Sequence, residues 1–285
     1  MTQPADGLLL IDKPPGVTSH DVVATVRRSR GVRKVGHAGT LDPMATGLLI
    51  LGIGRATRLL RFLGDLPKTY AGTFRLGVET TTLDADGEVT RTAAVDVSDE
   101  ALGSAMSALL GTSLQRPPAF SAVKVGGRKL YEAARAGEVL VAEPRPIRVD
   151  RFEATVRRDD EVDFVAVVSS GTYVRVLAAD VGATIGCGAH LTALRRTSIG
   201  PFSVEDASPP DGPAAQLLPL ERAVAHLPQV TLLEDEARAA LHGSVLGPAG
   251  EEGPYAVVDP NGSLIGIYRD DGPKGKPEVI LPRQA

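Results

Sequence analysis

The sequence predicts an α+β fold in which a large domain is followed by a small, β-rich one. Two observations support this prediction. Strand and helix patterns are interspersed through roughly the first 200 residues, and mostly strand patterns follow a change in composition at 208–213. The chain has 285 residues, of which 43% are hydrophobic and 23% charged, as in ordinary globular proteins. A chain of this length buries a sizeable core unaided.

Apolar runs and alternating patterns predict the strands of the large domain. The runs at 7–12 and 48–53 have the composition of buried strands, and 69–76 alternates as a half-buried strand does. A hairpin is expected within 147–170 and a further strand at 190–199. These strands are the expected framework of one sheet.

Four helices are expected between these strands. The first begins at Thr18 or Ser19, whose hydroxyl caps the first turn. A short basic helix is expected at 55–63. A third, at 98–110, has acidic residues in its first turn that complement the helix dipole, and a fourth is expected at 173–185.

The C-terminal part of the chain has a different organisation. A Pro-, Asp- and Gly-rich stretch at 208–213 is interpreted as a connection at the domain edge. The tail from Gln229 predicts a short helix and three strands, namely 235–242, 255–258, 264–268 and 279–281. We therefore expect one domain at 1–228 and a second at 229–285.

Charge is unevenly distributed along the chain. The net charge is −4, but residues 13–75 carry a local +8 and 114–151 a local +4, while 76–113 carry −6. Clustered Arg and Lys are typical of a face that binds a polyanion, although a solvated surface has the same appearance.

Several classes of protein lose support from what the sequence contains. Cys187 is the single cysteine, so an intramolecular disulfide and a multi-thiolate metal site are excluded. The apolar stretches at 7–11 and 47–53 are far shorter than the roughly 18 residues of a membrane helix, and no signal-peptide pattern begins the chain. We expect a soluble, cytoplasmic protein without membrane contact. The signatures of P-loop, serine-hydrolase and zinc sites do not occur.

The densest cluster of unusual residues is 35–47, which holds three glycines, a histidine and an Asp-Pro pair. This composition predicts a tight loop whose backbone approaches a ligand closely. Pro43 favours an extended Asp42 and removes an amide donor, which leaves the carboxylate of Asp42 free for chemistry. The alternative is an ordinary Asp-Pro turn.

A second cluster, at 169–175, places Tyr173 and Arg175 at the start of a helix directly after a strand. Side chains in that position converge on a cleft. Arg175 has apolar neighbours on both sides, and such an arginine usually requires a carboxylate partner. The alternative is a residue on the helix surface.

Seven blocks of sequence follow one another in the order of a known family. They are LIDKPPGVTSH at 10–20, GHAGTLDPMATG at 36–47, KTY at 68–70, PAFSAVK at 118–124, GTYVR at 171–175, GCGAH at 186–190 and LRR at 194–196. The chain thereby resembles the TruB family of tRNA pseudouridine-55 synthases over about residues 7 to 202. Beyond Leu227 the match is weak, and a PUA-type RNA-binding domain is inferred there from position and length.

The resemblance implies a catalytic domain with a central mixed, mainly antiparallel sheet flanked by helices, and a PUA-like domain at 229–285. It implies isomerisation of a uridine in the T-loop of tRNA, in which the N1–C1′ bond breaks, the uracil rotates and C5 joins C1′. No cofactor or metal is expected. The enzyme is expected to act as a monomer, with a mobile thumb at about 114–151 that orders against RNA.

The resemblance also implies catalytic roles. Asp42 matches the family's catalytic aspartate, and Arg175 matches the arginine that pairs with it. A carboxylate suits attack on C1′, attack on C6 of the pyrimidine, or removal of a ribose proton, and the sequence leaves these three routes open. A fixed fork of donors on Arg175 would hold this carboxylate ionised.

Five further positions are implied to contact the substrate. Tyr70, which is counted with Asp42 and Arg175 among the catalytic residues, would stack on the target base near the C5 proton, and Tyr173 would pack near the same pocket, although both also fit ordinary core tyrosines. His37 would fill the space left by a base that is flipped out of the loop. Lys13 and Leu194 complete the set.

Two rival functions remain open from the sequence. A non-catalytic tRNA-binding or folding factor could use the same basic face. A nucleosidase or glycosidase would release free uracil, but that route usually needs two carboxylates, and no second acid accompanies Asp42 in its loop.

Overall fold

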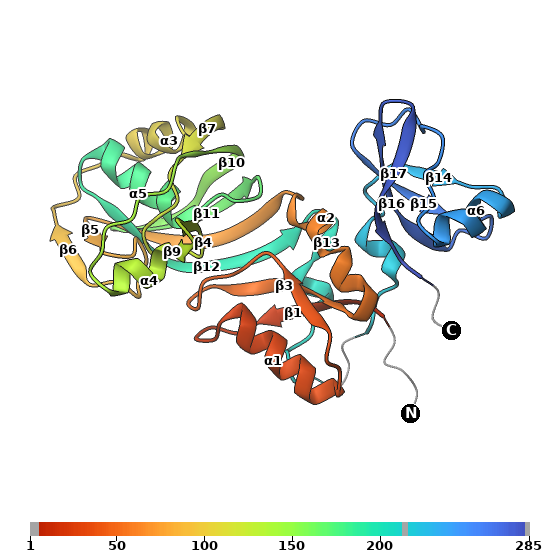
Figure 1. The fold of residues 1–285 in the computed structure, drawn as a ribbon. Coiled ribbons are helices and arrows are strands. Elements are labelled where there is room, and N and C mark those ends of the chain that lie inside the picture. The colour runs from red at the N-terminus through yellow and green to blue at the C-terminus, as the bar shows by residue number, and fades with distance from the viewer. Residues whose placement is uncertain (1–5, 213–215, 283–285) are drawn as a thin grey trace.

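The large domain is built on one mixed sheet. The computed structural model describes residues 6–212 and 216–282 (Figure 1). Within these residues the large sheet has nine strands, which are β1 (Gly7–Lys13), β2 (Val35–Ala38), β3 (Thr46–Ile53), β4 (Lys68–Leu76), β7 (Gly111–Gln115), β10 (Arg145–Arg158), β11 (Glu161–Val168), β12 (Ala189–Ile199) and β13 (Phe202–Ser203). The strand order is β1-β3-β12-β4-β11-β10-β7, with β2 beside β3 and β13 beside β12. The α+β fold is confirmed.

Strand β12 joins the two halves of this sheet. It runs antiparallel to β4 and parallel to β3, whereas the other neighbouring strands of the sheet are antiparallel. Arg196 on β12 is therefore opposite Gly47 on one side and Tyr70 on the other. The expectation of a mixed, mainly antiparallel sheet is confirmed, and its single parallel junction lies where the loop between β2 and β3 ends.

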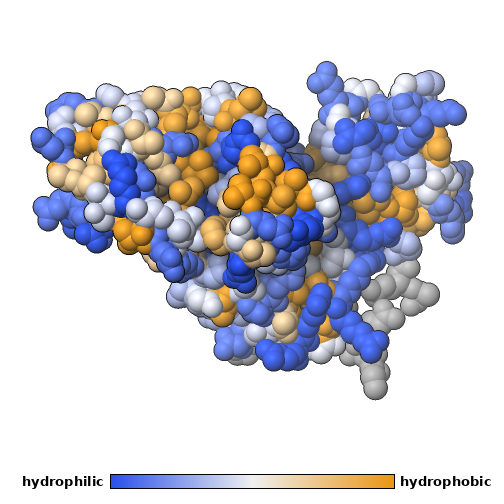
Figure 2. Space-filling view, turned by 60° about the vertical axis from the view of Figure 1, so that its left-hand side comes forward, coloured by the Kyte–Doolittle hydropathy of each residue, from blue (hydrophilic) through white to orange (hydrophobic). Residues whose placement is uncertain are grey.

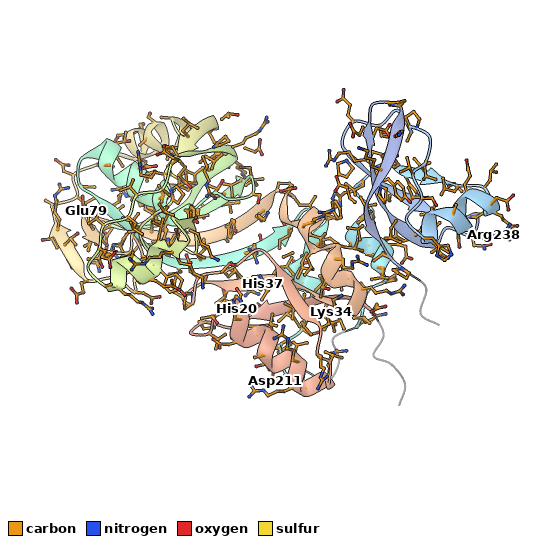
Figure 3. The ribbon with its side chains drawn as sticks, in the orientation of Figure 1. His20, Lys34, His37, Glu79, Asp211 and Arg238 are labelled. Carbon is orange, nitrogen blue, oxygen red and sulfur yellow. The ribbon has the colours of Figure 1, made fainter. Side chains whose placement is uncertain are left out.

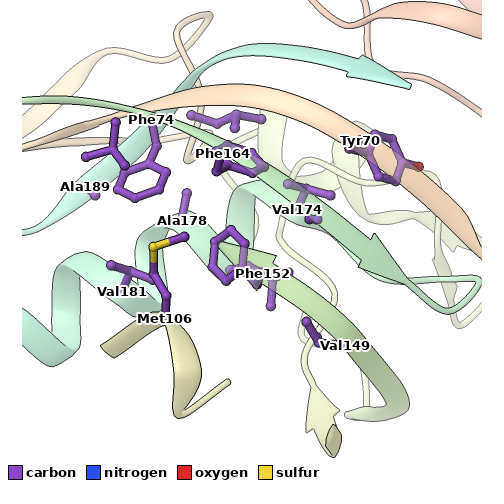
Figure 4. Packing of buried hydrophobic residues seen from close by; sticks show 14 of the residues in the cluster. Tyr70, Phe74, Met106, Val149, Phe152, Phe164, Val174, Ala178, Val181 and Ala189 are labelled. Carbon is purple, nitrogen blue, oxygen red and sulfur yellow. The ribbon is translucent and has the colours of Figure 1, made fainter. Parts of the chain in front are cut away.

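One face of the sheet carries the main core. Helices α3 (Asp99–Ser107) and α5 (Val174–Ile185) cover this face, as expected from their sequences. Phe74, Phe152 and Phe164 pack beneath them with ring centroids 5.4–6.5 Å apart. Figure 4 shows Tyr70 on β4 at the margin of this cluster.

The N-terminal helix α1 (Ser19–Arg30) packs on the β1–β3–β2 side of the sheet. Thr18 is its N-cap, with the side chain of Asp21 completing a capping box, and Gly31 ends the helix in the left-handed conformation. Its valines at 22, 23 and 26 are buried against β1 and β3. The prediction of a single helix at 55–63 is wrong, because this stretch forms a 3₁₀ helix η1 (Gly54–Arg58) and a separate helix α2 (Leu60–Gly64).

The segments between β4 and β10 hold most of the elements that the sequence did not reveal. They are β5 (Val78–Thr80), β6 (Val89–Thr92), β8 (Lys124–Val125), β9 (Arg128–Lys129) and α4 (Leu130–Arg135). The expected thumb at 114–151 is too long at both ends, since β7 and β10 pair with each other in the sheet. The segment outside the sheet is 116–144. Strand β7 was missed because residues 111–114 are exposed at a sheet edge and have no apolar alternation.

A separate four-stranded sheet forms the C-terminal lobe. Its elements are β14 (Gln229–Thr231), α6 (Glu234–Leu241), β15 (Pro254–Val258), β16 (Leu264–Asp271) and β17 (Lys274–Ile280). The short strand β14, which runs parallel to β15, was not expected. Figure 2 shows this lobe as a distinct mass with a largely hydrophilic surface.

The two sheets are held together through η1, α2 and β17. Phe62 and Leu63 belong to the same buried cluster as Val279 and Leu281. Arg61 forms an ion pair with Glu278 at 2.7 Å. The connection between the lobes, which includes η2 (Val204–Asp206) and η3 (Leu220–Ala223), follows β1, because Ser208 and Leu218 exchange main-chain hydrogen bonds with it. No helix in the described ranges is long and apolar enough to cross a membrane.

Candidate active site

Asp42 lies in the loop that connects β2 to β3. The preceding residue, Leu41, is buried and exchanges hydrogen bonds with Ser19 at the start of α1, at 3.0 and 3.3 Å. The main-chain oxygen of Asp42 accepts from Ala45 at 3.1 Å. The side chain of Asp42 keeps 38% of its surface exposed. The expected loop is shorter than predicted, because 35–38 form strand β2 and carry His37 on a strand.

The buried ammonium of Lys13 anchors this loop. Its ammonium donates to the carbonyl oxygens of Pro14, Val17 and Pro43 at 2.9, 2.7 and 3.2 Å, and the residue is fully buried. Burial lowers the pKa of Lys13 to about 8, and the nearby Asp42 carboxylate opposes that shift. Lys13 was expected to bind substrate. The structure instead places its ammonium where three main-chain acceptors occupy it, so that it positions the residue after Asp42.

Arg196 fixes both ends of the same loop. Its guanidinium donates to the carbonyl oxygens of Gly39 and Leu48 at 3.1 and 2.7 Å, and only 1% of the residue is exposed. Gly47 has φ of +99°, and a Cβ there would lie 2.3 Å from the main-chain oxygen of Arg196. The loop therefore ends at Gly47, where the main chain of Arg196 leaves no room for a side chain. No pattern in the sequence predicts this role for Arg196.

Arg175 joins Asp42 to two other segments. The guanidinium Nη2 lies 3.4 Å from Oδ2 of Asp42 and donates to the carbonyl oxygen of Phe120 at 2.7 Å. Its Nη1 lies 3.2 Å from Oδ2 of Asp84 and donates to the carbonyl oxygen of Thr82 at 3.3 Å. The predicted pairing with Asp42 is present, but the guanidinium is shared by two carboxylates, and Arg175 is only 4% exposed.

Asp84 is the acid that sequence reasoning missed. It is 3% exposed and accepts hydrogen bonds from the hydroxyl of Thr82 and the amide of Asp86. Its position is fixed by an isolated β-bridge to Leu191 on β12. No second acid accompanies Asp42 in its own loop, but Asp84 approaches it from another segment through Arg175. The sequence signal for it is the pair Asp84 and Asp86 within the acidic segment 76–113.

The electrostatic environment of Asp42 combines opposing effects. Burial raises the pKa of Asp42 above its ordinary value, the guanidinium of Arg175 opposes this rise, and Asp84 and Asp86 add to it. The carboxylate is therefore stabilised mainly by Arg175, with a smaller contribution from Lys13, in surroundings that otherwise disfavour its charge.

The two predicted tyrosines lie on different elements. Tyr173 is the N-cap of α5, and its ring lies 5.8 Å from the guanidinium of Arg175. The side-chain amide of Gln115 on β7 binds both main-chain polar groups of Tyr173, at 2.7 and 3.2 Å. Tyr70 is 7% exposed on β4, opposite Arg196. Gln115 was also missed, since a single amide in an exposed stretch carries no pattern.

His37 and Leu194 flank the loop. His37 packs edge-on against His20, with ring centroids 5.3 Å apart, and burial lowers the pKa of His37 (Figure 3). Leu194 on β12 helps to line an open cleft of about 530 Å³ together with Met44 and Thr46. No group of three or more His, Cys, Asp or Glu side chains in the described residues is arranged to hold a metal ion.

Comparisons with known proteins identify the family of the chain. Residues 27–174 match the profile of the TruB family pseudouridylate synthase N-terminal domain. The chain belongs to the TruB family. Residues 175–210 match the tRNA pseudouridylate synthase B C-terminal domain, and 227–282 match the C-terminal part of tRNA pseudouridine synthase II. The resemblance seen in the sequence is confirmed, and the chain is a pseudouridine synthase, an isomerase.

Individual TruB relatives cover nearly the whole chain. The tRNA pseudouridine synthase B of Mycobacterium sp. (strain KMS) is 46% identical over 98% of this chain and 97% of its own. That of Thermobifida fusca (strain YX) is 46% identical over 97% of this chain and 99% of its own. Among solved structures, a Cbf5–Nop10–Gar1 complex contains a chain with a TM-score of 0.76 and 27% identity, covering 97% of this chain and 85% of that one.

The close contact between Gly47 and Arg196 leads to a prediction about stability. Gly186 has φ of +93°, and a Cβ there would meet open space, so Gly186→Ala should destabilise by strain alone, about 1–2 kcal/mol. Gly47→Ala adds a collision with Arg196, and overpacking costs about 1–3 kcal/mol more. Urea unfolding followed by circular dichroism should rank Gly47→Ala as the less stable variant. Equal free energies of unfolding would contradict the tight junction.

Proposed function

We propose that this chain converts the uridine at position 55 in the T-loop of tRNA to pseudouridine. The observation that carries the proposal is a partly exposed Asp42 carboxylate held by the buried guanidinium of Arg175. The tRNA substrate is supported by the relatives, which are named tRNA pseudouridine synthase B. Position 55 comes from the resemblance of the sequence blocks around Asp42 and Arg175.

The reaction breaks the N1–C1′ bond of uridine, rotates the uracil, and forms a C5–C1′ bond. The hydrogen on C5 is lost as a proton, and N1 ends with a proton. Asp42 as an ionised carboxylate could attack C1′, attack C6, or remove a ribose proton. All three routes require the charged form, and the position of Arg175 favours that form over the protonated one.

The target base has to leave the folded T-loop before Asp42 can reach it. Enzymes that act on a base generally flip it out of the stack, and recognition of RNA concentrates on such splayed bases. In this proposal His37 fills the vacated space, while Tyr70 and Tyr173 pack against the flipped uridine. The location of Tyr173 beside the guanidinium of Arg175 supports this role for Tyr173.

The segment 116–144 is proposed to close over the RNA, and the domain at 229–285 is proposed to bind it in the manner of a PUA domain. Lys124 and Arg135 lie in this thumb and are exposed. Arg128 is engaged by Glu138 at 2.7 Å, which ties the thumb to itself in the free protein. Closure over RNA would bring these cations to phosphates.

The nucleosidase alternative receives no support from Asp84. A second carboxylate does approach Asp42 through Arg175, but Asp84 is 3% exposed and bound by its own neighbours. A general acid or base for glycosidic hydrolysis has to reach the substrate or its water.

Asp42→Asn should abolish isomerisation while tRNA affinity stays within a few-fold. The substitution keeps size and removes the charge, so the rate should fall by about 10³-fold or more. Release of tritium from uridine C5 in single turnover measures chemistry, and filter binding at fixed salt measures affinity. Retained turnover would remove Asp42 from the mechanism, and loss of both activities would indicate a collapsed loop.

The acid limb of the rate profile should lie above the pH at which an ordinary aspartate titrates. The pKa of Asp42 is raised, so its carboxylate is present above that pKa and is lost as pH falls through it. Asp84→Asn removes one charge that raises this pKa, and the limb should move to lower pH. Asp271→Asn, in the C-terminal sheet, is the control. An unmoved limb in Asp84→Asn would contradict the electrostatic coupling.

Binding of tRNA should depend steeply on salt despite the net charge of −4. Release of counterions makes log K fall linearly with log salt, and loss of one phosphate contact lowers the slope by about one. Lys124→Gln should reduce the slope in this way. Arg91→Gln is the control, because Arg91 is paired with Glu79 at 2.6 Å in the acidic segment. A salt-independent affinity would refute a basic RNA face.

A further inference from the structure

Three buried side-chain atoms in the described residues lack a hydrogen-bond partner. They are Nδ1 of His37, Oγ of Ser121 and Nε of Arg175. Leaving a buried polar group unpaired costs about 1–3 kcal/mol, so folded proteins seldom tolerate it without a reason. The three atoms come from β2, the thumb segment and α5, which are far apart in the sequence.

Two of these atoms belong to segments that meet beside Asp42. The guanidinium of Arg175 contacts Asp42 and donates to the carbonyl oxygen of Phe120 at 2.7 Å. Ser121 is the next residue along the chain. His37 lies on the strand that leads into the Asp42 loop. Two of the three unsatisfied groups, on Ser121 and Arg175, thus belong to segments joined beside Asp42, which is the arrangement expected where a polar ligand completes a site.

Ser121 is held firmly enough to present its hydroxyl. Its carbonyl oxygen accepts from the amide of Tyr131 at 3.1 Å, and the carbonyl of Val123 accepts from Leu130 at 2.8 Å. These bonds tie the start of the thumb to α4. Ser121 itself is 5% exposed, so water has little access to the hydroxyl in the free protein, and substrate reaches it only when the segment 116–144 moves.

We propose that the Ser121 hydroxyl hydrogen-bonds the flipped uridine in the active site, as a substrate-binding residue supplied by the thumb. A hydroxyl both donates and accepts, and uridine offers carbonyl oxygens, the N3 hydrogen and ribose hydroxyls. The inference rests on the proposed function and adds a contact to it. The hydroxyl is left unpaired in the free enzyme and is satisfied only when substrate is bound.

The test compares stability and turnover of Ser121→Ala. A hydroxyl without a partner can be removed without loss, so the melting temperature should be unchanged or higher. The single-turnover rate of C5 tritium release at subsaturating tRNA should fall about tenfold or more, as expected when a site built to bond a polar group loses that bond. Ser121→Cys keeps the approximate size of the side chain and a weak donor. Its single-turnover rate should lie between those of the wild-type enzyme and Ser121→Ala.

Ser19→Ala is the matched control for stability. Ser19 is also buried, but its hydroxyl bonds both main-chain groups of Leu41, so its loss should lower the melting temperature. A lower melting temperature for Ser121→Ala, or a variant that does not fold, would show a structural hydroxyl and overturn the proposal. So would wild-type turnover. The wild-type enzyme and Asp42→Asn, assayed alongside, report separately on the proposed function.

Discussion

The buried guanidinium of Arg175 is the interaction on which the site depends. It donates hydrogen bonds to Thr82, Asp84 and Phe120 and forms an ion pair with Asp42. A buried charge is costly unless it is paired and hydrogen-bonded, so each of these segments has to close around it for the cation to remain inside. The Asp42 loop, the turn at Thr82 and Asp84, and the segment that begins at Phe120 are thereby positioned by one side chain.

A layer of buried cations supports the opposite side of the loop. Lys13 and Arg196 are bound by main-chain carbonyl oxygens from both ends of the Asp42 loop. Lys68 is similarly buried, with its ammonium on the carbonyls of Gly64 and Leu66. Burial lowers the pKa of both lysines to about 8, which shows how fully they are withdrawn from water. The positive charge of Lys13 lies near the Asp42 carboxylate and favours its ionised form.

Much of the framework could be predicted from the sequence because it depends on local pattern. The apolar runs of β1 and β3, the alternation of β4, and the cap of α1 each follow from neighbouring residues. Strand β7 and the short strands of the thumb could not be predicted in this way, because an exposed edge strand needs only a partner and no apolar face. The helix at 55–63 was predicted wrongly because a 3₁₀ turn and an α-turn share the same composition.

The sequence by itself determined which chemistry is available. Asp42 before a proline, glycines at 39 and 47 where positive φ is needed, and an arginine at the start of α5 are fixed by residue type and local spacing. Only the tertiary structure decided which partners these groups have. Asp84 meets Arg175 across 91 residues, Lys13 is enclosed rather than presented, and the Ser121 hydroxyl is left unpaired. The partners of a charged or polar group depend on which loops the sheet brings together and on how much water these loops exclude. Neither property can be predicted from the residues adjacent in the sequence.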